Sequence, residues 1–93
     1  MARIWSVYDR DRRLVLAVAD EPGIFNFSKP PDDDVEPIEC EFATLQCYDT
    51  KAEPELLNIV LRCQDLEELL DELTNKGFAV IEGRPQPRKF ARL

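Results

Sequence analysis

The stretch of residues 57–83 constrains the fold more than any other part of the chain, because three patterns follow one another within it. Apolar side chains recur at every second position of residues 57–63, which predicts a strand with one firmly apolar face. The leucines of residues 66–73 are spaced i, i+3, i+4 and i+7, which is the stripe of an amphipathic helix. Residues 78–82 alternate again. The stretch therefore predicts a strand–helix–strand unit.

Both ends of this helix carry recognisable signals. Asp65 stands at the N-cap position and Glu68 follows three residues later, which predicts a capping box with Asp in place of Ser or Thr. Gly77 is suited to end the helix, and Phe78 can pack back on the last turn. The local sequence therefore predicts both ends of the helix.

The remaining chain predicts three more strands. Residues 2–8 and 13–19 are joined by a short polar turn, which favours a hairpin. Apolar residues on both faces of 13–19 predict a central place in the sheet, or a face reserved for a partner. Residues 40–48 predict a third strand, followed by a polar connection over 49–55. Residues 20–39 contain four prolines, so we expect a loop with no long regular element there.

These elements predict one small α+β domain over residues 1–83, with the order β-β-loop-β-β-α-β. Its sheet is antiparallel, has about five strands and carries one amphipathic helix. Residues 20–39 form an acidic, proline-rich loop, and residues 84–93 form a basic C-terminal tail. One helix of about eleven residues covers only part of such a sheet. The loop, the tail, a second copy of the chain or another protein is therefore expected to cover the rest.

The chain lacks the residues that most enzymes and metal sites use. It contains no histidine, which removes the commonest general base and excludes Ser-His-Asp and Cys-His catalysis. It has three glycines and no glycine-rich phosphate loop. The carboxylates of residues 32–36 lack the offsets and the glycine of a calcium loop. We therefore expect a protein that is not an enzyme, with no catalytic residue, no cofactor and no metal.

Three cysteines, at positions 40, 47 and 63, are odd in number and widely spaced, with no Cys-x-x-Cys pair. They are interpreted as small core residues in a reducing compartment. The alternative is a reactive thiol, but Glu39 and Glu41 flank Cys40 with the wrong sign of charge. No apolar run approaches the roughly 20 residues of a membrane span, and the N-terminus lacks the apolar segment of a secretory signal. A cytoplasmic protein with no membrane contact is expected.

Charge is the main indication of function. The net charge is −7, and residues 21–55 carry two basic and ten acidic side chains, whereas residues 84–93 carry four basic and none acidic. Nucleic-acid binding by the acidic body is disfavoured, because such binding depends on neutralising phosphates. An acidic face can simply be solvated, or it can steer association with a basic patch on another protein. In its extreme form such a surface would mimic DNA.

We therefore expect a protein-binding module, a regulator or inhibitor that acts on a basic surface of another protein, and that can also form a homodimer. Ile24, Phe25 and Phe27 are too apolar for a plain loop: either they tuck under the sheet or they form a contact patch. The candidate partner-binding residues are Ile24, Phe25, Phe27, Asp32, Asp33, Asp34, Glu67, Asp71, Arg88, Lys89 and Phe90.

The unit over residues 57–83 resembles the strand–helix–strand element of the vicinal oxygen chelate (glyoxalase-like) fold. The matching residues are Val60, Asp65, Leu66, Leu69, Leu73, Gly77, Phe78 and Val80. The metal ligands of that fold, His and Glu on the following strands, have no match here. The resemblance implies an alternative function, a small-molecule-binding domain of glyoxalase-like or ferredoxin-like type that works as a dimer. Its pocket would be lined by Trp5, Tyr8, Phe25 and Phe27.

Overall fold

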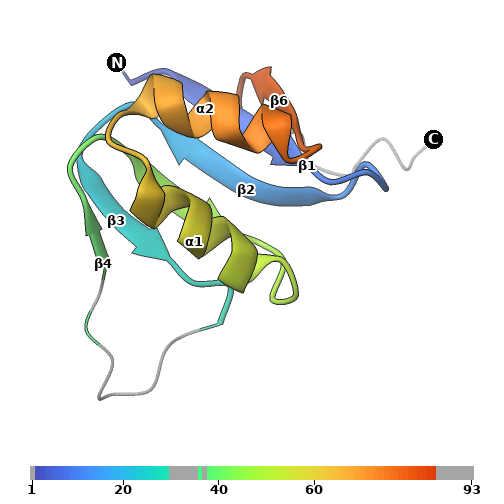
Figure 1. The fold of residues 1–93 in the computed structure, drawn as a ribbon, viewed down its shortest axis with the longest axis horizontal. Helices are drawn as coiled ribbons and strands as arrows, with labels where there is room; N and C mark the ends of the chain where they lie inside the picture. Colours follow the sequence, from blue (N-terminus) through green and yellow to red (C-terminus); the bar gives the residue numbers. More distant parts are fainter. Residues whose placement is uncertain (1, 30–35, 37, 86–93) are drawn as a thin grey trace.

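Six strands form one mixed sheet with the order β4-β3-β5-β2-β1-β6 (Figure 1). The computed structural model describes residues 2–29, 36 and 38–85. The strands are β1 (Ile4–Tyr8), β2 (Leu14–Ala19), β3 (Gly23–Asn26), β4 (Ile38–Cys40), β5 (Thr44–Cys47) and β6 (Ala79–Glu82). Two helices, α1 (Glu53–Arg62) and α2 (Leu66–Asn75), complete the small α+β fold.

The predicted N-terminal hairpin is confirmed. β1 and β2 pair antiparallel, and β2 lies between β1 and β5 in the interior of the sheet. The turn is organised by the Asp9 carboxylate, whose Oδ1 accepts hydrogen bonds from the backbone N–H groups of Asp11 and Arg13, both at 2.9 Å. Arg12 takes a left-handed conformation with φ of 64°, the place where such loops reverse the chain.

The sheet differs from the prediction in both strand number and direction. The region predicted as an irregular loop contains β3, which pairs antiparallel with β4 and parallel with β5. The strand predicted over residues 40–48 forms only as β5, because Cys40 ends the preceding strand β4 and the chain is not extended in a strand over residues 41–43. β3 is only four residues long, which fits between Pro22 and the later prolines. A short strand of this kind gives little alternation for a sequence pattern to detect.

The strand predicted over residues 57–63 is wrong, because the chain there is helix α1. Its buried residues Leu56, Ile59 and Val60 are spaced i, i+3 and i+4, which is a helical period. The run over residues 56–61 is apolar at every position except Asn58, so it also contains the alternation of a strand. Pro54 in the first turn, with Glu53 and Glu55 beside it, is a helix-start signal. This helical unit does not reproduce the strand–helix–strand element on which the glyoxalase-like resemblance depends.

Helix α2 and strand β6 are confirmed. Asp65 Oδ1 accepts a hydrogen bond from the Glu68 N–H at 2.8 Å, and Glu68 Oε1 accepts one from the Gln64 N–H at 2.7 Å. The two side chains therefore cap the helix reciprocally, as in a capping box. Gly77 has a φ of 98° directly after the helix, and the Phe78 N–H donates to the Leu73 carbonyl at 3.0 Å.

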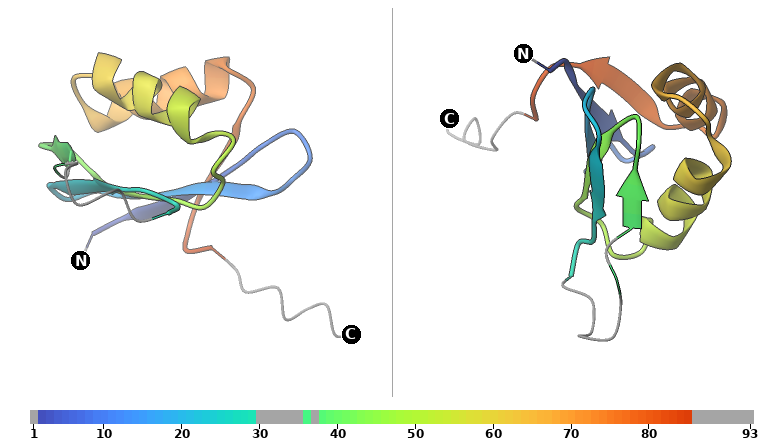
Figure 2. Two further views of the ribbon diagram at one scale, coloured as in Figure 1. Left: turned by 90° about the horizontal axis from the view of Figure 1, so that it is seen from below. Right: turned by 90° about the vertical axis from the view of Figure 1, so that its left-hand side faces the viewer.

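Both helices cover the same face of the sheet (Figure 2). The core lies between them and the inward row of each strand, and includes Val7, Leu16, Leu45, Leu69 and Leu73, each fully buried. The opposite face of the sheet has no helix over it in the part of the chain that the structure describes. The fold thus has two distinct surfaces, an outer helical surface and an uncovered sheet face.

Candidate protein-binding surfaces

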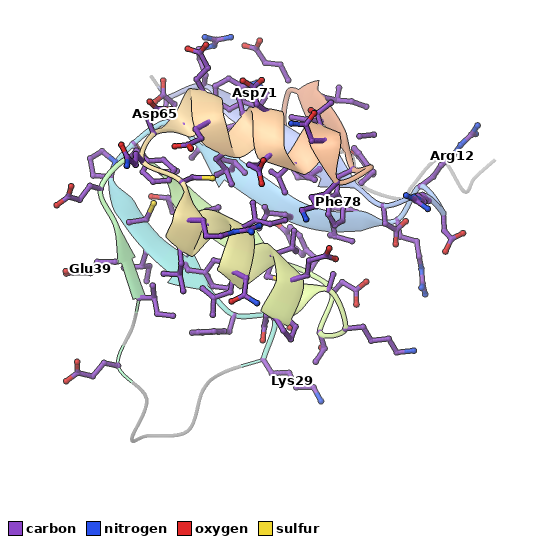
Figure 3. The ribbon with its side chains drawn as sticks, viewed as in Figure 1. Arg12, Lys29, Glu39, Asp65, Asp71 and Phe78 are labelled. Carbon is purple, nitrogen blue, oxygen red and sulfur yellow. The ribbon has the colours of Figure 1, made fainter. Side chains whose placement is uncertain are left out.

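Five carboxylates gather on and beside α2. Their side chains line one shallow depression of about 380 Å³, to which no residue of another kind contributes. We call this set the acidic face; it consists of Asp65, Glu67, Glu68, Asp71 and Glu72. Figure 3 shows Asp65 at the start of the helix and Asp71 farther along it. The acidic face lies on the outside of the helical layer, away from the sheet.

The carboxylates of the acidic face differ in what the fold uses them for. Asp65 and Glu68 accept the capping hydrogen bonds, and Glu72 lies 3.6 Å from the Arg62 guanidinium. Glu67 and Asp71 make no hydrogen bond or ion pair through their carboxylates within the described residues. They are four residues apart on one helix, where like charges repel each other.

The helix dipole accounts for only part of this charge. Glu67 and Glu68 lie in the first turn, where the exposed N–H groups favour a carboxylate. Asp71 lies beyond that turn, and the last turn of α2 has no basic residue to offset it. The Asp71 carboxylate therefore does not stabilise the helix through the helix dipole.

The acidic face is not arranged as a metal cage. Among the described residues, no three His, Cys, Asp or Glu side chains come together in a way that could hold a metal ion. Carboxylates spread along a helix produce a negative field over an extended area instead. Such a field attracts a surface that carries several positive charges.

The second surface is the uncovered side of the sheet, which we call the open face. Strand pairing places its members in two rows, one through Ile4, Ala19 and Thr44 and the other through Ser6, Ala17, Gln46 and Asn26. These seven side chains, all on the four inner strands, are uncharged. At the β4 edge the same side of the sheet carries Glu39, which pairs with Ile24. Two large apolar side chains are exposed beside the seven: Tyr48 is 50% exposed, and Ile81, which pairs with Ser6, is 57% exposed.

The chain leaves β6 across the open face. Gly83 has a φ of 133°, a conformation that favours glycine, and its carbonyl accepts a hydrogen bond of 2.7 Å from the buried Ser6 hydroxyl. Arg84 and Pro85 then stand beside a shallow hollow of about 390 Å³. Figure 2 shows this segment on the side away from the helices. The hollow is lined by Ile4, Ala17, Val18, Ala19, Thr44, Gln46, Tyr48, Arg84 and Pro85.

The structure separates the residues that the sequence grouped as partner-binding. Phe25 is 1% exposed and belongs to the core, and Phe27 is partly buried against it with its ring centroid 5.2 Å from that of Phe25. Ile24 is 37% exposed. The tucked-in alternative thus describes both phenylalanines, and Phe25 is not available to a partner. Glu67 and Asp71 are exposed on α2. Asp32, Asp33, Asp34, Arg88, Lys89 and Phe90 lie outside the described residues.

The aromatic pocket of the alternative function is not formed as the sequence suggested. Trp5 is 8% exposed and Phe25 is 1% exposed, both within the core under the helices. The Arg3 guanidinium stacks 4.8 Å from the centre of the Trp5 ring. These rings and the partly buried Phe27 occupy the space between sheet and helices that a ligand would need.

All three cysteines are buried and unpaired. Burial raises the pKa of the Cys47 thiol, and nearby Glu53 and Asp49 raise it further, against the opposing effect of backbone hydrogen bonding by Asp49 and Tyr48. Burial likewise raises the pKa of Cys63, with Glu68 and Glu72 adding to the effect. Both side chains are therefore neutral thiols near neutral pH, and they lack the thiolate character that a redox sensor requires.

The sequence predicted a sheet that is only partly covered, but it did not identify the residues of the open face, because β3 and α1 were not predicted. One signal was present: small or uncharged residues alternate with large apolar ones over 16–19 and 44–47, so that one face of each strand has little side-chain bulk. Both helices in the described ranges are too short and too polar to cross a bilayer. Comparison with known protein families, with curated proteins and with solved structures found no match to this chain.

Proposed function

We propose that this chain is a non-enzymatic protein-binding module whose acidic face docks on a basic surface of another protein. The observation that carries the proposal is the pair Glu67 and Asp71. The two carboxylates are exposed, adjacent on one helix face and unpaired within the described residues. A like-charge pair at this spacing costs a few tenths of a kcal/mol, which binding to a cationic surface would offset.

A binding role fits the rest of the acidic face. Its charge would steer the approach of a basic partner and set its orientation, and would contribute more to the association rate than to the lifetime of the complex. A small domain that occupies the basic surface of a larger protein acts on that protein as a regulator or inhibitor. The free, buried cysteines support a reducing compartment, and we place this function in the cytoplasm.

Affinity capture with matched charge variants tests the proposal. The wild-type domain is immobilised, exposed to lysate of the source cell at low and at high salt, and the retained proteins are quantified by mass spectrometry. The test variant is Glu67→Lys/Asp71→Lys. We expect the proteins retained at low salt to be lost with this variant, and their retention to fall at high salt because salt screens exposed charges.

The control variant, Asp11→Lys/Asp20→Lys, makes the same change in net charge outside the acidic face. Both of its side chains are exposed, and neither carboxylate makes a hydrogen bond or ion pair within the described residues. It should retain the same proteins as the wild type. Equal losses with both variants would show that only net charge matters, and would rule out the acidic face as a specific docking surface.

A further inference from the structure

We propose that the open face is the interface of a back-to-back homodimer, in which the sheets of two copies pack against each other. This inference does not depend on the proposed function, because it concerns the opposite side of the molecule. It is based on the charge, the shape and the residue sizes of the open face.

Charge favours a second copy as the occupant. Two molecules that each carry a net charge of −7 repel each other, and the repulsion is smallest where the meeting surfaces are uncharged. The centre of the open face supplies such a surface, because its seven side chains on β1, β2, β5 and β3 are neutral and Glu39 lies at the β4 edge. Among the described residues that line the hollow, the one cation is Arg84. A partner with a strongly basic surface would find its complement on the acidic face instead.

Shape also favours self-association. The open face carries a ridge, formed by Arg84 and Pro85, directly beside the hollow floored by Ala17 and Ala19. A two-fold axis that runs between ridge and hollow places the ridge of each copy over the hollow of the other. The hydrogen bond between Ser6 and the Gly83 carbonyl fixes the start of the ridge in place. The ridge is therefore positioned before association, which reduces the entropy lost on binding.

The size of the floor residues allows close contact. Sheets pack face to face at about 10 Å, a spacing that side chains of both inner faces must fill together. Ala17 and Ala19 leave room for the partner's ridge, while Tyr48 offers a half-exposed aromatic ring at the border of the hollow. An arginine that reaches an aromatic face gains a cation–π contact, which Arg84 of one copy and Tyr48 of the other would form.

The expected dimer is moderate in strength. Six strands, separated by five spacings of about 4.8 Å, give the face a width of roughly 24 Å, which puts the interface at the small end of the range for specific complexes. We expect a micromolar dissociation constant. Such a dimer leaves both acidic faces pointing outward, one on each side.

Sedimentation velocity of the full chain, at concentrations from below to above the micromolar range, tests the proposal. We expect the mass to rise with concentration from one chain to two. Added salt should strengthen the dimer, because it screens the repulsion between acidic copies. This response is opposite to that expected for binding at the acidic face, so the two proposals can fail independently.

Two variants address the interface and one serves as the control. Tyr48→Asp places a carboxylate at the border of the hollow, and Ala17→Arg fills its floor; each should raise the dissociation constant at least about tenfold, a loss of about 1.4 kcal/mol. Tyr48 is half-exposed, so its replacement leaves the core intact. The control is Asn58→Asp, which makes the same charge change at an exposed position of α1. It should leave the dissociation constant unchanged.

Circular dichroism confirms that each variant is folded before its mass is compared. The proposal is overturned if the wild-type chain keeps the mass of one copy at every concentration. The open face would then be covered by the chain itself or by another protein. Folded Tyr48→Asp that dimerises as strongly as the wild type would overturn it as well.

Discussion

At the scale of single residues, Gly23 marks a close approach in the sheet, where β3 passes β5. A Cβ atom added to Gly23 would overlap the Thr44 hydroxyl oxygen and lie 2.8 Å from Thr44 Cβ. The hydroxyl is in turn held by a hydrogen bond to the Glu21 carbonyl at 3.2 Å. Glycine at this position is therefore what allows the parallel pairing of β3 with β5, the part of the topology that the sequence pattern did not predict.

We expect Gly23→Ala to lower the free energy of unfolding by about 1–3 kcal/mol, because the added methyl group overpacks a tight contact. Thr44→Gly in the same chain should recover part of the loss, since it removes both clashing atoms. Thr44→Ala should recover less, because its Cβ remains. Urea unfolding of the single and double variants measures the coupling between the two sites. Additive effects of Gly23→Ala and Thr44→Gly would contradict this account of the contact.

At the scale of elements, prediction succeeded where one segment carried several independent signals. Asp65, Glu68, the leucine stripe and Gly77 all indicated α2, and each is used in the structure as expected. In α1 the nearly continuous apolar run over residues 56–61 was compatible with two periods, and Pro54 in the first turn, with Glu53 and Glu55 beside it, was the signal that favoured the helix. For β3 the stretch was too short to show any period. The acidic half of the candidate site was predictable because it lies on α2, whereas the open face depends on strand pairing that only the fold defines.

Burial on α2 predicts unequal costs for neighbouring leucines. Leu69 is fully buried and Leu70 is partly buried. Leu69→Ala should cost about 2–5 kcal/mol and Leu70→Ala distinctly less, since less packing is removed at a partly exposed site. Asp65→Ala should cost about 1 kcal/mol, because the Glu68 N–H loses its cap. Chemical denaturation provides the three values. Equal costs at Leu69 and Leu70 would mean that α2 packs on the sheet with a different face.

At the scale of the whole molecule, the fold divides two tasks between its two sides. The helical layer buries the core beneath it and carries the carboxylates outside, while the other side of the sheet is neutral at its centre and has the Arg84–Pro85 ridge beside it. The Arg3–Glu82 pair, with two hydrogen bonds of 2.9 and 3.0 Å, links the N-terminus to β6 at the sheet edge where the chain turns onto the open face. The proposed docking surface and the proposed dimer interface therefore share no residue, so occupation of one does not block the other.

The buried thiols connect this architecture to alkaline stability. The pKa values of Cys47 and Cys63 are raised above the ordinary value of 9.0 in the folded state, so the unfolded chain releases these protons at lower pH than the folded chain does. Their contribution to stability is therefore complete below the ordinary thiol pKa and declines as the pH rises through and above it. We expect the free energy of unfolding to fall as the pH rises from about 8 to about 10, the range in which unfolded cysteines ionise. Unfolding curves of the wild type and of Cys47→Ala/Cys63→Ala at each pH measure the effect: the variant is less stable throughout, and its stability should change less with pH. A variant with the same pH dependence as the wild type would show that other groups cause the alkaline loss.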